Sequence, residues 1–91
     1  MTPLHFVSQT GNTEIMDLLI ERGADINALN KDGNTPLMLA LYTNHREAAE
    51  LLLQNKADQY IKNIEGLTAF VIALSRCREL IPMLTDKGNQ V

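Results

Sequence analysis

The tripeptide Thr-Pro-Leu occurs at residues 2–4 and again at residues 35–37, so its two copies begin 33 residues apart. A weaker third copy, Thr-Ala-Phe at residues 68–70, begins 33 residues further on. A fixed period of this size is typical of repeat arrays, in which each unit buries its apolar face against its neighbours. The chain is therefore predicted to be a single repeat domain. Its predicted extent is 1–91, with units at about 2–34, 35–67 and 68–91.

Each unit has the pattern of two short helices separated by a tight turn. Thr2 and Thr35 each precede Pro, and Thr caps free amide groups at a helix start while Pro suits the first helical position. Gly11 and Asn44 occupy the predicted turns because both tolerate left-handed backbone. The predicted helices cover about 4–10, 13–22, 36–42, 46–55, 69–75 and 78–86. In each of the first two units, the second helix is predicted to have one buried stripe. The residues of these stripes are Ile15, Leu18, Leu19, Ala48, Leu51 and Leu52.

A segment without helical periodicity joins successive units. We call residues 24–33 the first finger and residues 57–66 the second finger. The first finger ends in Asp-Gly and the second in Glu-Gly, and Asp-Gly is a strong tight-turn signal. Both fingers are predicted to be extended segments with a β-turn at the tip.

The third unit departs from the period after its first helix. At a spacing of 33, Pro82 falls opposite Met16 and Ala49 on the buried stripe, whereas a shift of one residue moves it to an outward position. The same shift aligns Leu84 with Leu52. The turn of this unit is therefore predicted to be one residue shorter, with Pro82 in the first turn of its second helix, where a missing N–H costs little.

These motifs resemble those of the ankyrin-repeat family. The family signature Thr-Pro-Leu-His-x-Ala is matched by Thr-Pro-Leu-His-Phe-Val at residues 2–7 and by Thr-Pro-Leu-Met-Leu-Ala at residues 35–40. The resemblance implies an all-α solenoid of helix–turn–helix units joined by β-turn fingers. It also implies a protein that binds partner proteins and has no chemistry of its own. Because one signature begins at residue 2, we expect the chain to belong to a longer array, or its N-terminal face to be covered.

No constellation of residues indicates catalysis or metal binding. His5 belongs to the repeat signature and His45 precedes a predicted helix, so both are predicted to be structural, the second as a helix cap. Cys77 is the single cysteine, which excludes an intrachain disulfide and fits a reducing compartment. Its neighbours Arg76 and Arg78 would lower the pKa of a nucleophilic thiol, but a turn residue is the favoured interpretation. We expect no enzyme, no cofactor and no metal.

Composition and charge limit the kinds of partner and the cellular location that are expected for the protein. The net charge is -3, with acidic and basic residues mixed along the chain, so neither nucleic acid nor a membrane is an expected partner. No apolar run approaches the roughly 18 residues of a membrane span. No signal-peptide pattern precedes the first motif. An intracellular, cytoplasmic location is expected, with the nucleus or delivery into a host cell as alternatives.

The resemblance places the partner-binding positions at the finger tips and at the ends of the first helices. Carried over position by position, they are Gln9, Thr10, Leu29, Lys31, Asp32, Asn34, Tyr42, Thr43, Lys62, Ile64, Glu65, Leu67, Ser75 and Arg76. Tyr is favoured at interfaces, and packing does not require an aromatic residue at Tyr42. Leu29, Tyr42, Ile64 and Leu67 are predicted to form an apolar binding patch. The alternative is that Ile64 and Leu67 pack under the finger against the third unit.

The predicted function is binding of another protein through the finger tips and the concave face of the first helices. One alternative is a structural spacer or capping segment of a longer repeat array. Another is weak self-association through the uncovered first repeat.

Overall fold

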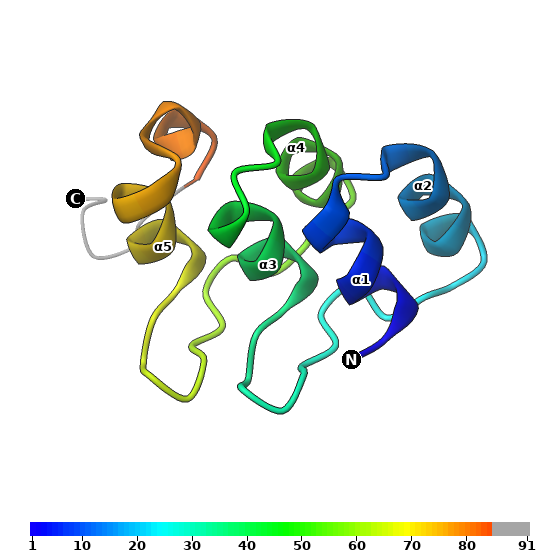
Figure 1. Cartoon of the computed structure of the whole chain (residues 1–91), viewed down its shortest axis with the longest axis horizontal. Coiled ribbons are helices and arrows are strands. Elements are labelled where there is room, and N and C mark those ends of the chain that lie inside the picture. The colour runs from blue at the N-terminus through cyan, green and yellow to red at the C-terminus, as the bar shows by residue number, and fades with distance from the viewer. Residues whose placement is uncertain (85–91) are drawn as a thin grey trace.

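The helices of this chain pair into three units that stand side by side in chain order, as the computed structural model shows (Figure 1). The structure describes residues 1–84. Within them the chain forms five α-helices, one 3-10 helix and no strand, so the predicted all-α repeat architecture is confirmed. The helices are α1 (Pro3–Thr10), α2 (Thr13–Glu21), α3 (Pro36–Tyr42), α4 (Arg46–Gln54), α5 (Ala69–Arg76) and the 3-10 helix η1 (Arg78–Met83).

Threonine caps fix the starts of the first helices. The hydroxyl oxygen of Thr35 accepts a hydrogen bond from the backbone N–H of Met38 at 3.2 Å, and Thr68 caps α5 in the same way. In α1, Thr2 and His5 form a reciprocal capping box. All five α-helices begin and end within one residue of their predicted bounds.

The turns within the first two units use left-handed backbone, as predicted. Gly11 has φ 81° and Asn44 has φ 59°. A Cβ placed on Gly11 would lie 2.5 Å from Cδ2 of His45, so glycine also makes room for the imidazole ring of the next unit. The predicted capping role of His45 is wrong, because no side-chain hydrogen bond caps α4. Instead, its Nδ1 lies 2.8 Å from the hydroxyl oxygen of Thr43.

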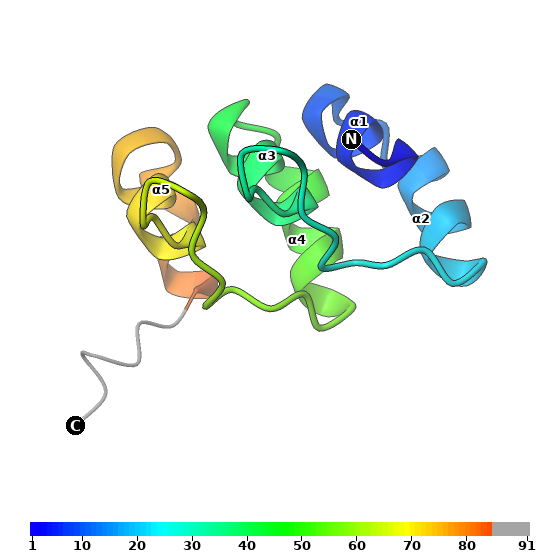
Figure 2. The ribbon, with the colours of Figure 1, turned by 90° about the horizontal axis from the view of Figure 1, so that it is seen from below.

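The core is aliphatic and lies between the units. Leu37, Leu41 and Leu52 of the middle unit are fully buried, because the first and third units cover the middle unit on both sides (Figures 1 and 2).

The predicted buried stripe on the second helix of the first unit is partly wrong. Ile15 is 40% exposed and Leu18 is 47% exposed, because they lie on α2 at the outer end of the stack.

The second helix of the third unit differs from the prediction. Residues 78–83 form a 3-10 helix rather than the start of an α-helix over 78–86, and residues 85 and 86 lie outside the described part. Pro82 has no N–H to donate, and it disfavours α-helical backbone in Ile81 before it. Leu84 then takes extended backbone with ψ 148°. Pro82 is exposed and Leu84 is buried, both as the shorter turn predicts.

The second helices α2 and α4 are followed by residues in the same left-handed conformation. Gly23 has φ 87° and Lys56 has φ 68°. Glycine adopts this backbone without penalty, whereas a residue with a Cβ is strained there.

Replacing Lys56 with glycine is expected to stabilise the fold by about 1 kcal/mol, because the strain of a Cβ at positive φ is relieved. Urea titration followed by circular dichroism measures the free energy of unfolding. Gln54→Gly, at the last residue of α4, is the matched control and is expected to destabilise the fold by up to about 1 kcal/mol. A Lys56→Gly variant less stable than the parent would contradict the assigned strain.

Candidate functional site

An asparagine side chain closes each finger tip. The amide oxygen Oδ1 of Asn63 accepts hydrogen bonds from the backbone N–H groups of Glu65 and Leu67, both at 3.0 Å. Asn30 makes the equivalent pair of bonds in the first finger. Gly33 has φ 76° and donates its N–H to the carbonyl oxygen of Asn30 at 2.9 Å. The predicted turn at the tip of each finger is therefore confirmed, and its shape is held by backbone and amide groups.

Hydrogen bonds also join the two fingers to each other. The backbone N–H of Ile64 donates to the carbonyl oxygen of Asp32 at 3.1 Å. The amide Nδ2 of Asn63 donates to Oδ1 of Asn34 at 2.9 Å and to the hydroxyl oxygen of Tyr42 at 3.4 Å. Because Asn63 is only 7% exposed, these bonds are shielded from water. The two tips and the end of α3 are thus held together as one surface.

A shallow depression of about 390 Å³ lies on this surface, and we call it the finger groove. The fingers that form it lie on the side of the first helices, away from α2 and α4 (Figures 1 and 2). Ile64 stands out from the groove with 74% of its surface exposed, whereas Tyr42 is half-buried. The lining residues are Asp32, Asn34, Tyr42, Asn63, Ile64 and Glu65.

The structure brings together only some of the positions that the sequence proposed. The predicted positions that line the groove are Asp32, Asn34, Tyr42, Ile64 and Glu65. The predicted positions that do not line it are Gln9, Thr10, Leu29, Lys31, Thr43, Lys62, Leu67, Ser75 and Arg76.

The predicted apolar patch of four residues is not assembled as a unit. Leu67 is partly buried and packs against the core, whereas Leu29 is 56% exposed but lies outside the groove lining. Ile64 does not pack under the finger and remains exposed, whereas Leu67 packs against the core. One of the two alternatives therefore holds for each residue. Asn63 was missed as a groove residue. Its signal in the sequence is that Asn30 holds the same place in the first finger.

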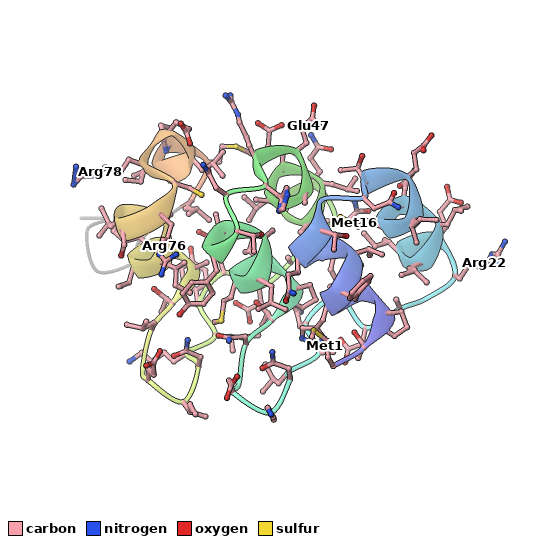
Figure 3. The ribbon with its side chains drawn as sticks, viewed as in Figure 1. Met1, Met16, Arg22, Glu47, Arg76 and Arg78 are labelled. Atoms are coloured by element: carbon pink, nitrogen blue, oxygen red, sulfur yellow. The ribbon has the colours of Figure 1, made fainter. Side chains whose placement is uncertain are left out.

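Arg76 orients the aromatic ring at the edge of the groove. Its guanidinium carbon lies 5.6 Å from the centroid of the Tyr42 ring, a cation–π contact. Its Nη1 is also 3.5 Å from the carbonyl oxygen of Tyr42. In Figure 3, Arg76 lies beside α5 at the level of the helices, above the finger tips. The Tyr42 side chain therefore has Arg76 on its ring and Asn63 at its hydroxyl.

His5 joins α1 to the residue that follows the first finger. Its ring nitrogen Nε2 lies 2.8 Å from the carbonyl oxygen of Asn34. Because a carbonyl oxygen only accepts, Nε2 carries the hydrogen, and Nδ1 accepts from the backbone N–H of Thr2 at 3.1 Å. His5 is fully buried, and both of its nitrogens are used in structural hydrogen bonds.

Cys77 lies in the turn between α5 and η1, as predicted, and it is also part of the core. It is fully buried, and its thiol lies 3.2 Å from the carbonyl oxygen of Leu41 and 3.0 Å from Oδ1 of Asn44. Burial raises the pKa of the Cys77 thiol, the charge of Glu79 raises it further, and Arg76 opposes both effects. A buried thiol with a raised pKa is a poor nucleophile.

A second depression, of about 380 Å³, lies between α2 and α4 on the far side from the fingers. Its lining is mostly acidic and consists of Thr13, Glu14, Asp17, Glu47, Glu50, Leu51 and Gln54. Among residues 1–84, no three His, Cys, Asp or Glu side chains gather in a way that could hold a metal ion. No helix in that part of the chain has the length and apolar character needed to cross a bilayer.

The fold and the tied fingers define a helical repeat protein with helix–turn–helix units. The family described as ankyrin repeats (3 copies) matches residues 1–63. The chain belongs to the ankyrin-repeat family. Repeats of this family are generally protein–protein interaction modules and are generally not enzymes.

Relatives share one repeat-sized stretch with this chain. The fibronectin type 3 and ankyrin repeat domains 1 protein of Mus musculus is 58% identical over 38 residues, 41% of this chain and 11% of that protein. The E3 ubiquitin-protein ligase XBAT33 of Arabidopsis thaliana is 51% identical over 37 residues, 41% of this chain and 7% of the ligase. The ankyrin repeat and SOCS box protein 5 of Oryctolagus cuniculus is 61% identical over 31 residues, 34% of this chain and 9% of that protein. Each match covers only a small part of the relative.

Replacing Asn63 with alanine is expected to lower the free energy of unfolding by about 1–3 kcal/mol, because buried polar groups lose their partners. Asn30→Ala is the matched control, since it removes the same turn bonds but none between the fingers. The control is expected to cost less, and urea titration of both variants measures the difference. Equal losses in the two variants would show that the bonds from Asn63 to Asn34 and Tyr42 contribute nothing.

Proposed function

We propose that this chain binds a partner protein through the finger groove. The single observation that carries the proposal is the exposure of Ile64, at 74%, on a surface that internal hydrogen bonds hold in place. A large apolar side chain in such a place gains contact area when a partner covers it. Because the tips are already ordered, binding there orders few additional groups.

Tyr42 and Ile64 are the proposed anchors of the interface. Both line the groove, and aromatic and aliphatic residues that fill a partner's pockets carry much of the binding energy at protein interfaces. Asp32 and Glu65 form a polar rim beside them. The remaining positions proposed from the family resemblance extend this surface along the finger tips and the ends of α1, α3 and α5.

Replacing Ile64 with aspartate is expected to reduce partner capture about tenfold or more, because a charge replaces an apolar anchor. The immobilised chain and its variants are incubated with cell extract, and retained proteins are quantified by mass spectrometry. Leu18→Asp is the matched control, since Leu18 is also an exposed apolar residue but lies on α2. Proteins lost with Ile64→Asp and kept with Leu18→Asp support the proposal. If the Ile64 variant retains every protein that the parent retains, the finger groove is not the binding surface.

The outer face of the first unit favours a second function, self-association. Phe6 is 57% exposed, whereas Leu39 at the same place in the second unit is 8% exposed. Ile15 is 40% exposed, whereas its counterpart Ala48 is 1% exposed. In the second unit the first unit covers these positions, so the same positions in the first unit form an apolar face that is left exposed. The proposed occupant is the same exposed face of a second copy of the chain.

Self-association predicts a mass that rises with protein concentration in sedimentation experiments. Replacing Phe6 with serine is expected to shift the equilibrium toward the monomer, because the exposed apolar area falls. Ile64→Asp is the control and is expected to leave the mass unchanged. A parent chain that stays monomeric at its highest soluble concentration rules this function out. A spacer role, the remaining alternative, predicts no effect of any of these variants on binding or mass.

A further inference from the structure

The finger groove carries negative charge without a cation in its lining. Asp32 and Glu65 stand at the same place in the two finger tips, and both are exposed. Within residues 1–84 the one ion pair joins Arg46 and Glu50 on α4. Neither groove carboxylate is neutralised by an ion pair in that part of the chain.

The two carboxylates are not used to build the tips. Asp32 is fixed through its backbone, which donates to Oδ1 of Asn30 and accepts from Ile64. Glu65 is fixed through its backbone N–H, which donates to Oδ1 of Asn63. An ionised carboxylate has several acceptor positions, and these remain open to a donor from outside.

The negative charge of the groove lies at the finger tips, where Asp32 and Glu65 stand. Arg76 does not line the groove; it lies at the level of the helices, against the ring of Tyr42 (Figure 3). Ile64 is next to both acidic residues, because it precedes Glu65 in the chain and its backbone N–H donates to the carbonyl oxygen of Asp32. A complementary occupant therefore needs a positive charge and an apolar group close together.

Resting on the proposed function, we propose that the finger groove binds a protein segment in which a Lys or Arg side chain stands next to an apolar side chain. The cation lies between the carboxylates of Asp32 and Glu65, and the apolar group covers Ile64. The groove, at about 390 Å³, is near the lower end of the range for ligand pockets and has room for one or two side chains. Acidic segments are rejected, because like charges across an interface are unfavourable.

Selection from a random dodecapeptide phage library tests this proposal with a defined probe. The parent chain is expected to enrich peptides with Lys or Arg next to an apolar residue. The double variant Asp32→Asn/Glu65→Gln is expected to lose that enrichment. The matched control is Asp17→Asn/Glu47→Gln, which removes the same charge from the far depression and is expected to keep it. Circular dichroism establishes that both double variants are folded.

A synthetic peptide from the enriched set gives the size of the effect. Its dissociation constant is expected to rise about threefold to tenfold in the groove double variant, the range for two solvent-exposed ion pairs. Added salt is expected to weaken binding to the parent, because exposed charges are screened.

The outcomes separate this proposal from the function on which it rests. Enriched peptides that lack a basic residue, or that bind the groove double variant as well as the parent, overturn the charge preference. Protein binding at the groove still stands if Ile64→Asp abolishes their binding. If nothing is enriched, or if enriched peptides bind Ile64→Asp unchanged, both proposals fail.

Discussion

Burial of the middle unit between its two neighbours is the interaction on which the rest of the structure depends. A single helix pair has an apolar stripe on each side and cannot cover both. Leu37, Leu41 and Leu52 are fully buried because the units stack. The stability of such an array is approximately a sum of unit terms and nearest-neighbour terms. The hydrogen bonds between the two fingers belong to the nearest-neighbour terms.

The architecture was predictable because its signals are local. A threonine before a proline starts a helix, and Gly11 or Asn44 allows the chain to turn, whatever lies elsewhere in the fold. The misjudged features depend on distant contacts or on one unusual residue. His45 packs against the turn of the preceding unit rather than capping its own helix. The 3-10 geometry of η1 follows from Pro82, whose exposure was predicted but whose effect on the helix type was not.

The candidate site was predictable only in part, for a related reason. Ile64 and Leu67 are both apolar and both flank the turn of the second finger, so the sequence alone does not separate them. The turn that Asn63 closes leaves Ile64 exposed, whereas Leu67 packs against the core. Which apolar residue is available to a partner is therefore decided by the hydrogen bonds of a neighbouring amide.

The fingers separate the groups that hold their shape from the groups that they display. The turns are held by Asn30, Asn63 and the glycines, which are identical in the two fingers, whereas Lys31 is replaced by Ile64 at the equivalent tip position. Side chains at the tips can therefore be exchanged without removing any hydrogen bond that shapes the turn. In evolutionary terms, the exposed side chains of the finger tips can diverge faster than the fold.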